Sequence, residues 1–109
     1  MTENKKNKKV YISLPISGLD LEIRKDVALR AEIQLRGLGY DVFNPLGDGW
    51  VAGLSQNEYM KRDLKALLDC DAIYMMKGWN HTLNCKLELD NAIAIGIDVW
   101  FEGMNDIRL

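Results

Sequence analysis

The order of the secondary-structure signals along this chain constrains its fold most. Short runs rich in β-branched and aromatic residues, which are typical of strands, alternate with longer stretches whose apolar residues recur at helical spacing. The predicted strands span residues 10–14, 40–44, 71–76 and 97–101, and the predicted helices span 20–38, 55–68 and 82–95. Strands and helices that alternate in this way are typical of a parallel sheet whose crossovers are helices.

Capping residues support the helix boundaries. Asp20 suits the N-cap of the first helix, and Ser55 followed by Glu58 forms a capping box for the second. Gly39 and Gly96 suit the positions just beyond the ends of the first and third helices. In the first helix, the stripe expected to face the core is Ile23, Val27, Ala31, Leu35 and Leu38.

We therefore expect an α/β fold, a three-layer flavodoxin-like or Rossmann-like parallel sheet of about four strands with helices on both faces. Right-handed crossovers restrict the topology, and the strand order 2-1-3-4 is our choice. In such sheets ligands bind at the carboxyl ends of the strands, where the strand order reverses. This rule brings residues 14–18, 47–54 and 77–84 to one crevice.

The composition is that of a soluble globular chain. Of the 109 residues, 48% are apolar and 28% are charged, which fits one ordinary domain, assigned here to residues 9–109. Lysines cluster at the start of the chain, at Lys5, Lys6, Lys8 and Lys9, and residues 1–8 are expected to form a disordered basic tail. No apolar segment follows them, and no apolar run approaches the ~20 residues that span a bilayer. We expect no membrane partner.

The formal charge of −2 and the pI near 5.3 argue against nucleic acid as a partner. Cys70 and Cys85 lie in apolar settings without a CxxC pair, so they are interpreted as buried thiols of a cytoplasmic protein. The lone His81 leaves too few ligands for a zinc site. We expect neither a metal nor a cofactor.

Two carboxylates occupy apolar helix faces. Glu88 falls three residues after Cys85, on the stripe that continues through Leu89 and Ala92. A buried carboxylate is costly unless it has a partner. Asp63 similarly flanks the apolar stripe of the second helix. Glu88 either turns out at the edge of its stripe, pairs with another group or has a task. The helix dipole explains Glu88 in part and Asp63, which is mid-helix, poorly. Together in one crevice the two acids suggest a pair that performs acid–base or nucleophilic chemistry.

Other residues near the crevice allow two interpretations. Asp71 is favoured as a turn residue. Trp79 and Trp50 either cover the core or stack on a planar ligand. Ser17 and Gly18 offer a weak anion site, and Thr82 is most simply a helix cap, at a helix N-terminus that also suits a phosphate.

Six segments resemble the nucleoside 2-deoxyribosyltransferase superfamily, especially its small bacterial and phage relatives that carry an uncharacterised domain and are related to 2′-deoxynucleoside 5′-phosphate N-hydrolases. The resemblance covers residues 9–101, and the order and spacing of the segments carry it. They are 10–18 (VYISLPISG), 39–45 (GYDVFNP), 59–64 (YMKRDL), 70–73 (CDAI), 78–79 (GW) and 82–88 (TLNCKLE).

The resemblance implies roles for several residues. Glu88 matches the family's nucleophile, which attacks the anomeric carbon, and the glycosyl-enzyme is then resolved by a second base or by water. Asp63 matches the aspartate that contacts the nucleoside and helps to protonate the leaving base, and Tyr11 matches the tyrosine that positions the nucleophile. The expected substrate-binding residues are Ile16, Ser17, Gly18, Trp79, Thr82 and Asn84, with Thr82 in the place of a serine that contacts the 5′-phosphate.

The chain departs from the family pattern in two places. Asn84 and Cys85 replace small residues, often Gly-Ala, before the glutamate. In the family's transferases, which are longer, a neighbouring subunit supplies an asparagine that only Asn105 imitates here. Hydrolysis of, or binding to, a nucleoside or nucleotide is therefore favoured over transfer. A non-catalytic nucleotide-binding or sensor module and a structural protein with a vestigial pocket are the alternatives. Leu83 and Leu87 suit a homodimer or higher homo-oligomer in each case.

Overall fold

The structure is a computed structural model that describes residues 8–104. Its strands are β1 (Lys9–Ser13), β2 (Asp41–Phe43), β3 (Ala72–Met75) and β4 (Asp98–Phe101). Its helices are α1 (Leu21–Gly37), α2 (Gln56–Leu68), the short 3₁₀ helix η2 (Trp79–His81) and α3 (Leu83–Ile95). The expected tail at residues 1–8 lies outside this part except for Lys8, and Asn105 lies outside it entirely.

The four strands form one parallel sheet in the order β2-β1-β3-β4, which confirms the predicted fold class and strand order. β1 lies between β2 and β3, and its Tyr11 is in register with Phe43 on one side and Ile73 on the other. The first crossover passes to β2 and the second returns to β3 on the other side of β1. The strand order therefore reverses beside β1, where the ligand crevice was expected.

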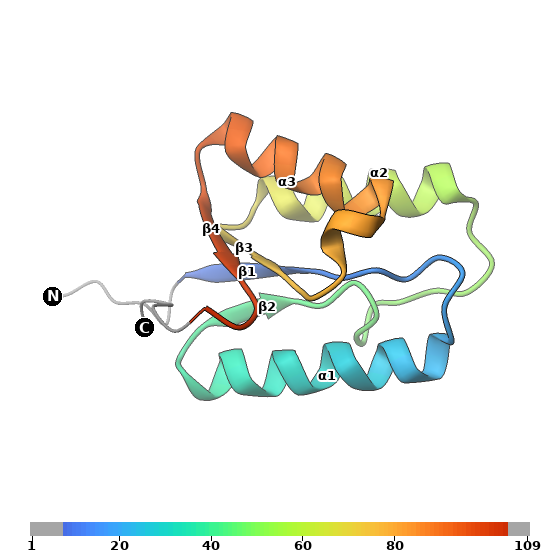
Figure 1. The fold of residues 1–109 in the computed structure, drawn as a ribbon, viewed down its shortest axis with the longest axis horizontal. Coiled ribbons are helices and arrows are strands. Elements are labelled where there is room, and N and C mark those ends of the chain that lie inside the picture. The colour runs from blue at the N-terminus through green and yellow to red at the C-terminus, as the bar shows by residue number, and fades with distance from the viewer. Residues whose placement is uncertain (1–7, 105–109) are drawn as a thin grey trace, which may run out of the picture.

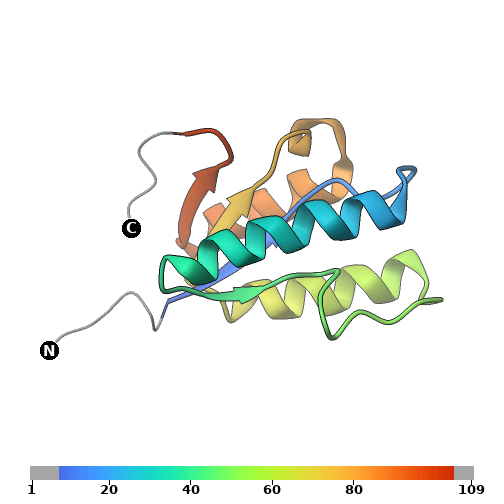
Figure 2. The ribbon, with the colours of Figure 1, turned by 90° about the horizontal axis from the view of Figure 1, so that it is seen from below.

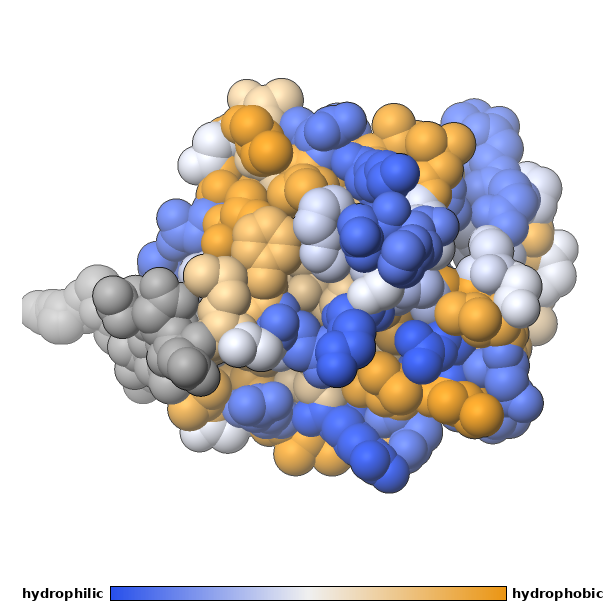
Figure 3. Space-filling model, in the orientation of Figure 1, coloured by the Kyte–Doolittle hydropathy of each residue, from blue (hydrophilic) through white to orange (hydrophobic). Residues whose placement is uncertain are grey.

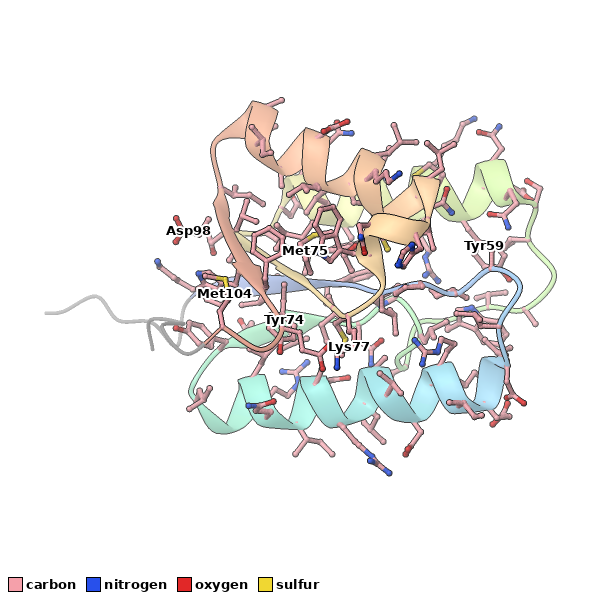
Figure 4. The ribbon with its side chains drawn as sticks, in the orientation of Figure 1. Tyr59, Tyr74, Met75, Lys77, Asp98 and Met104 are labelled. Carbon is pink, nitrogen blue, oxygen red and sulfur yellow. The ribbon has the colours of Figure 1, made fainter. Side chains whose placement is uncertain are left out.

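Three layers surround this sheet. α1 covers one face, and α2 and α3 lie together on the other (Figure 1). The view from below has α1 in front of the strands with α2 and α3 behind them (Figure 2). Tyr74 and Met75 are neighbours on β3 and lie on opposite sides of the sheet (Figure 4), Tyr74 toward α1 and Met75 toward α3.

Alternation along β1 divides the core in the same way. Val10, Ile12 and Leu14 pack toward α1, whereas Tyr11 belongs to the cluster under α2 and α3. Because successive strand residues point to opposite faces, Ser13 shares the side of Tyr11. The side of β1 that faces α2 and α3 thus carries two hydroxyls in an otherwise apolar layer.

The predicted helix boundaries are confirmed by their caps. The Asp20 side chain accepts a hydrogen bond from the Ile23 backbone N–H, and the Ser55–Glu58 capping box is complete at the start of α2. α3 ends against Gly96 in a left-handed conformation. These caps satisfy N–H and C=O groups that the helix itself leaves unpaired.

One part of the predicted α1 stripe is wrong. Ala31 and Leu35 are buried as expected, and Val27 and Leu38 are partly buried, but Ile23 is 57% exposed. Leu21 packs against the core at the start of the helix instead. Leu21, Ala28 and Leu35 are seven residues apart, so the helix turns this side to the sheet and leaves Ile23 in solvent.

Candidate functional site

A cleft of about 430 Å³ opens at the carboxyl ends of the strands, the place that the strand order predicts. This volume lies within the roughly 300–1,000 Å³ typical of small-molecule sites. The loop after β1, the start of α2 and the segment from η2 into α3 form its walls. The residues that line it are Leu14, Ile16, Ser17, Pro45, Gln56, Asp63, His81, Thr82, Leu83, Asn84 and Glu88.

Glu88 is the buried acid of this cleft, with 6% of its surface exposed. The Tyr11 hydroxyl donates to Glu88 Oε2 at 2.8 Å, and the Ser13 hydroxyl donates to Oε1 at 2.7 Å. Both donors come from β1, more than seventy residues away in sequence. Tyr11 is itself held by Phe43, whose ring stacks on it at 5.3 Å. The Glu88 carboxylate is thus held at both oxygens by one inner strand of the sheet.

Burial raises the pKa of Glu88 to about 7. The two hydroxyl donors oppose that rise because they stabilise the charged form, and the negative charge of Asp63 adds to it. Burial, and then the charge of Glu88, also raise the pKa of Tyr11 well above its ordinary value. Tyr11 therefore remains a neutral donor, while Glu88 changes charge near neutral pH.

Asp63 lies in the same cleft, and its side chain is 13% exposed. Arg62 Nε and Nη2 both approach Asp63 Oδ1, at 2.9 and 2.8 Å, and Arg62 Nη2 also donates to the Pro45 carbonyl at 2.7 Å. Burial raises the pKa of Asp63, and the Arg62 cation opposes this. No hydrogen bond is recorded to the other carboxylate oxygen, Oδ2, within residues 8–104.

The α3 N-terminus forms one end of the cleft. Thr82 is the N-cap, and its Oγ1 accepts a hydrogen bond from the Cys85 backbone N–H at 3.3 Å. Asn84 therefore lies inside the helix rather than at its cap, and no non-glycine residue in the described part has a positive φ. The asparagine that replaces a small residue here fits the backbone without strain.

Gly78 fixes the position of the segment that leads from β3 through η2 to α3. Its φ is 93°, and an added Cβ would lie 3.1 Å from Pro15 Cγ. Only glycine combines that conformation with so close an approach at low cost. The loop after β3 consequently packs onto the loop after β1, which brings His81 and Thr82 to the cleft.

A second lobe of about 190 Å³ adjoins the first. Ser17, Gln56 and Asp63 are among the residues that line both lobes, and Trp50 and Tyr59 line the second alone. The Lys25 ammonium sits 4.2 Å from the centre of the Trp50 ring. Figure 4 labels Tyr59 near the start of α2, at the opposite end of the molecule from Asp98. The second lobe thus offers aromatic surface beside the first lobe, which contains Glu88.

Most of the predicted site residues meet in the cleft. The cleft is lined by Glu88, Asp63, Ile16, Ser17, Thr82 and Asn84. Tyr11, on β1, donates a hydrogen bond to Glu88. Two of the predicted site residues lie elsewhere. Gly18 is exposed and outside both lobes, and Trp79 packs on Phe101 at 5.5 Å in the core under α3. Of the two interpretations of Trp79, the one in which it covers the core fits this placement.

Asp71 takes the turn role that was favoured for it. Its Oδ2 accepts a hydrogen bond from the Lys9 backbone N–H at 2.9 Å, at the amino ends of β1 and β3. The cleft lies at the opposite, carboxyl edge of the sheet.

Sequence reasoning missed Ser13, Arg62, Gln56 and His81. Ser13 had a signal, because it lies two residues after Tyr11 and so on the same side of the strand. Gln56 donates to Ser17 Oγ at 3.1 Å across the mouth of the cleft. The pairing of Arg62 with its neighbour Asp63 has no signal of its own in the sequence, since adjacent helix residues do not normally face each other.

Between residues 8 and 104, no group of three or more His, Cys, Asp or Glu side chains is placed to hold a metal ion. None of the helices in that range is long and apolar enough to cross a membrane.

The fold and site define an α/β protein with a buried, hydroxyl-bound glutamate at the switch point of a parallel sheet. The chain belongs to the family described as "Domain of unknown function (DUF4406)", which matches residues 8–101. That match spans the whole sheet and every residue of the cleft. No protein with a curated description matches the chain.

Proposed function

We propose that this protein cleaves the N-glycosidic bond of a nucleoside or a nucleoside 5′-monophosphate, with Glu88 as the nucleophile. The observation that carries the proposal is the Glu88 carboxylate, which is buried in a cleft, held at both oxygens by hydroxyls and accompanied by a second acid, Asp63. Such pairs support covalent glycoside chemistry. The resemblance of residues 9–101 to the deoxyribosyltransferase superfamily supports the same chemistry.

In this mechanism a Glu88 oxygen attacks C1′ of the sugar, and the bond from C1′ to the base nitrogen breaks. The electron pair goes to the base, which takes a proton from Asp63 or from a water that Asp63 orients. A water then attacks C1′, its proton passes to Asp63, and the bond from C1′ to the Glu88 oxygen breaks, which releases the sugar and the Glu88 carboxylate. Hydrolysis uses water as the acceptor, whereas transfer requires a second base in the same cleft.

The test is to incubate the protein with each deoxynucleoside and deoxynucleoside monophosphate and to detect free base by chromatography. Wild type should release base, and Glu88→Gln should lose at least about a hundredfold in rate. Glu22→Gln is the matched control, because Glu22 is exposed on α1 on the other side of the sheet. Equal rates for Glu88→Gln and wild type would contradict the nucleophile role.

The pH dependence adds a second check. A nucleophilic carboxylate must be ionised, and the pKa of Glu88 is about 7 in the free protein. The rate at low substrate concentration should therefore rise as pH increases from about 6 to 8. A rate that does not rise anywhere between pH 6 and 8 would contradict an ionised Glu88 as the nucleophile.

The second candidate is a nucleotide-binding module without turnover. The ion pair of Asp63 with Arg62 favours it, because the cation stabilises the ionised carboxylate and opposes the rise in the pKa of Asp63 that burial causes. The aromatic lobe at Trp50 and Tyr59 suits a bound base in either case. Raised thermal stability with a nucleotide, without base release, would select this candidate.

A further inference from the structure

The Ser13 hydroxyl is the least expected polar group in the core. Ser13 is the last residue of β1, and it is 1% exposed among apolar neighbours. Burying a hydroxyl is unfavourable unless it makes a hydrogen bond. The Ser13 hydroxyl donates to Glu88 Oε1 at 2.7 Å, and it also makes a side-chain hydrogen bond with the Cys85 thiol. Ser13 therefore offsets its burial by contacting the acid of the cleft.

Two donors restrain Glu88 in a way that one cannot. A glutamate side chain turns about three bonds, and a hydrogen bond to one oxygen alone leaves the carboxylate free to rotate about its last bond. Tyr11 holds Oε2 and Ser13 holds Oε1. Both belong to β1, an inner strand of the sheet that is paired on both sides, so one strand sets the plane of the carboxylate.

The titratable groups around this carboxylate cannot replace Ser13. Tyr11 on β1 already donates to the other oxygen. Asp63 on α2 is an acid, and its charge raises the pKa of Glu88 further. Cys85 on α3 is a buried thiol whose pKa burial raises, so it is a weak, neutral donor. His81 of η2 lines the same cleft, and no hydrogen bond from it to Glu88 is recorded in residues 8–104.

We propose that Ser13 is a positioning residue that orients the Glu88 carboxylate and stabilises its ionised form, and thereby sets the pH range in which the cleft works. This inference deepens the proposed function. Its kinetic consequence rests on that function, whereas the effect of Ser13 on the titration of Glu88 does not. Tyr11 is the partner implied by the family resemblance; Ser13 enters through the geometry alone. Without the Ser13 hydroxyl, Glu88 Oε1 loses the one hydrogen-bond donor that it has among residues 8–104.

The experiment follows the Glu88 carboxyl carbon by NMR in protein labelled with ¹³C-glutamate, with the signal assigned through Glu88→Gln. In Ser13→Ala, the titration midpoint should move upward by about one pH unit, because a hydrogen bond to a charged group is lost. Ser13→Thr, which keeps the hydroxyl, should bring the titration midpoint of Glu88 most of the way back to its wild-type value. Ile12→Val is the control, since Ile12 is buried on the same strand but faces α1.

A midpoint in Ser13→Ala equal to that of wild type would overturn the proposal, as would an equal upward change in Ile12→Val. If Ser13→Ala does not fold, Ser13→Cys keeps a similar size with a weaker donor and gives the same comparison. This titration needs no substrate. A protein that releases no base but shows the change refutes the hydrolase and retains Ser13 as the positioning residue.

If base release is observed, Ser13→Ala should lower kcat by about tenfold near pH 7, leave KM nearly unchanged and move the rise of the pH profile upward. A structural role alone would reduce the amount of active protein without moving the profile. An unmoved profile would therefore also contradict the proposal.

Discussion

Glu88 combines burial with a charge that can be lost near neutral pH. Tyr11 and Ser13 stabilise the carboxylate, but burial outweighs them and raises its pKa to about 7. Binding sites often keep such groups because a reactive acid must be both desolvated and oriented. At this site orientation comes from β1 and desolvation comes from α2 and α3, so the two requirements are met by different elements.

This arrangement predicts a pH-dependent effect on stability. The pKa of Glu88 is about 7 when folded, above its ordinary value of 4.5, so the unfolded chain loses the proton first as pH rises. Stability from Glu88 is fully present below about pH 4.5 and is lost as pH passes through 7, by on the order of 3 kcal/mol. Glu88→Gln does not titrate, so its stability relative to wild type should increase from pH 5 to pH 8.

Urea unfolding of both proteins at pH 5 and pH 8 measures this difference. Glu22→Gln serves again as the control, because Glu22 is exposed and its substitution should change stability by a similar small amount at both pH values. A difference between Glu88→Gln and wild type that is the same at pH 5 and pH 8 would contradict the raised pKa.

At the scale of elements, the cleft depends on where strands and helices end. β1 supplies Tyr11 and Ser13 from its length and Ile16 and Ser17 from the loop that follows it. α2 and α3 both begin at the cleft, so their first turns carry residues into its walls. The caps that fix these helix starts therefore also fix the site.

The α2 cap gives a prediction at this scale. Ser55 Oγ accepts from the Glu58 N–H at 3.1 Å, and Glu58 Oε1 accepts from the Ser55 N–H at 2.9 Å. Ser55→Ala removes half of this box and should lower the free energy of unfolding by about 1 kcal/mol. Urea unfolding measures it, with Lys61→Ala in the exposed middle of α2 as a control expected to stay within about 0.5 kcal/mol. Equal losses in the two variants would argue against the cap.

At the scale of the whole molecule, the two faces of the sheet are covered unequally. α1 covers one face alone, whereas α2 and α3 share the other (Figure 1). Along the upper edge of the space-filling view, where α3 runs, hydrophobic residues alternate with hydrophilic ones (Figure 3). Leu83 is 70% exposed and Leu87 39% exposed, one turn apart on this helix. The homo-oligomer expected from the sequence would use this surface.

The prediction is that wild type sediments as a dimer or larger, and that Leu83→Glu with Leu87→Glu sediments as a monomer, because charges would enter the apolar contact. Analytical ultracentrifugation measures both. Leu29→Glu on α1, where Leu29 is 49% exposed, is the control and should leave the assembly unchanged. A monomeric wild type at micromolar concentrations would refute the oligomer.

Local signals determined the elements and their order. Strand and helix periodicities, the caps at Asp20 and Ser55, and the stop at Gly96 act within a few residues, so the sequence alone was enough to predict them. Right-handed crossovers then left few topologies, and 2-1-3-4 was among them. Helical spacing alone also placed Glu88 on the α3 stripe, but it left open whether the side chain turns out at the edge of that stripe, and the structure shows it buried.

Only the tertiary structure decided which groups meet. How a helix rotates over a sheet depends on all its contacts at once, and this turned Leu21 inward and Ile23 outward, and placed Trp79 against Phe101 rather than in the cleft. The pairing of Ser13 with Glu88 joins residues 75 positions apart. Such a contact is set by packing between layers, which no local pattern encodes, and it turns a buried acid into an oriented one.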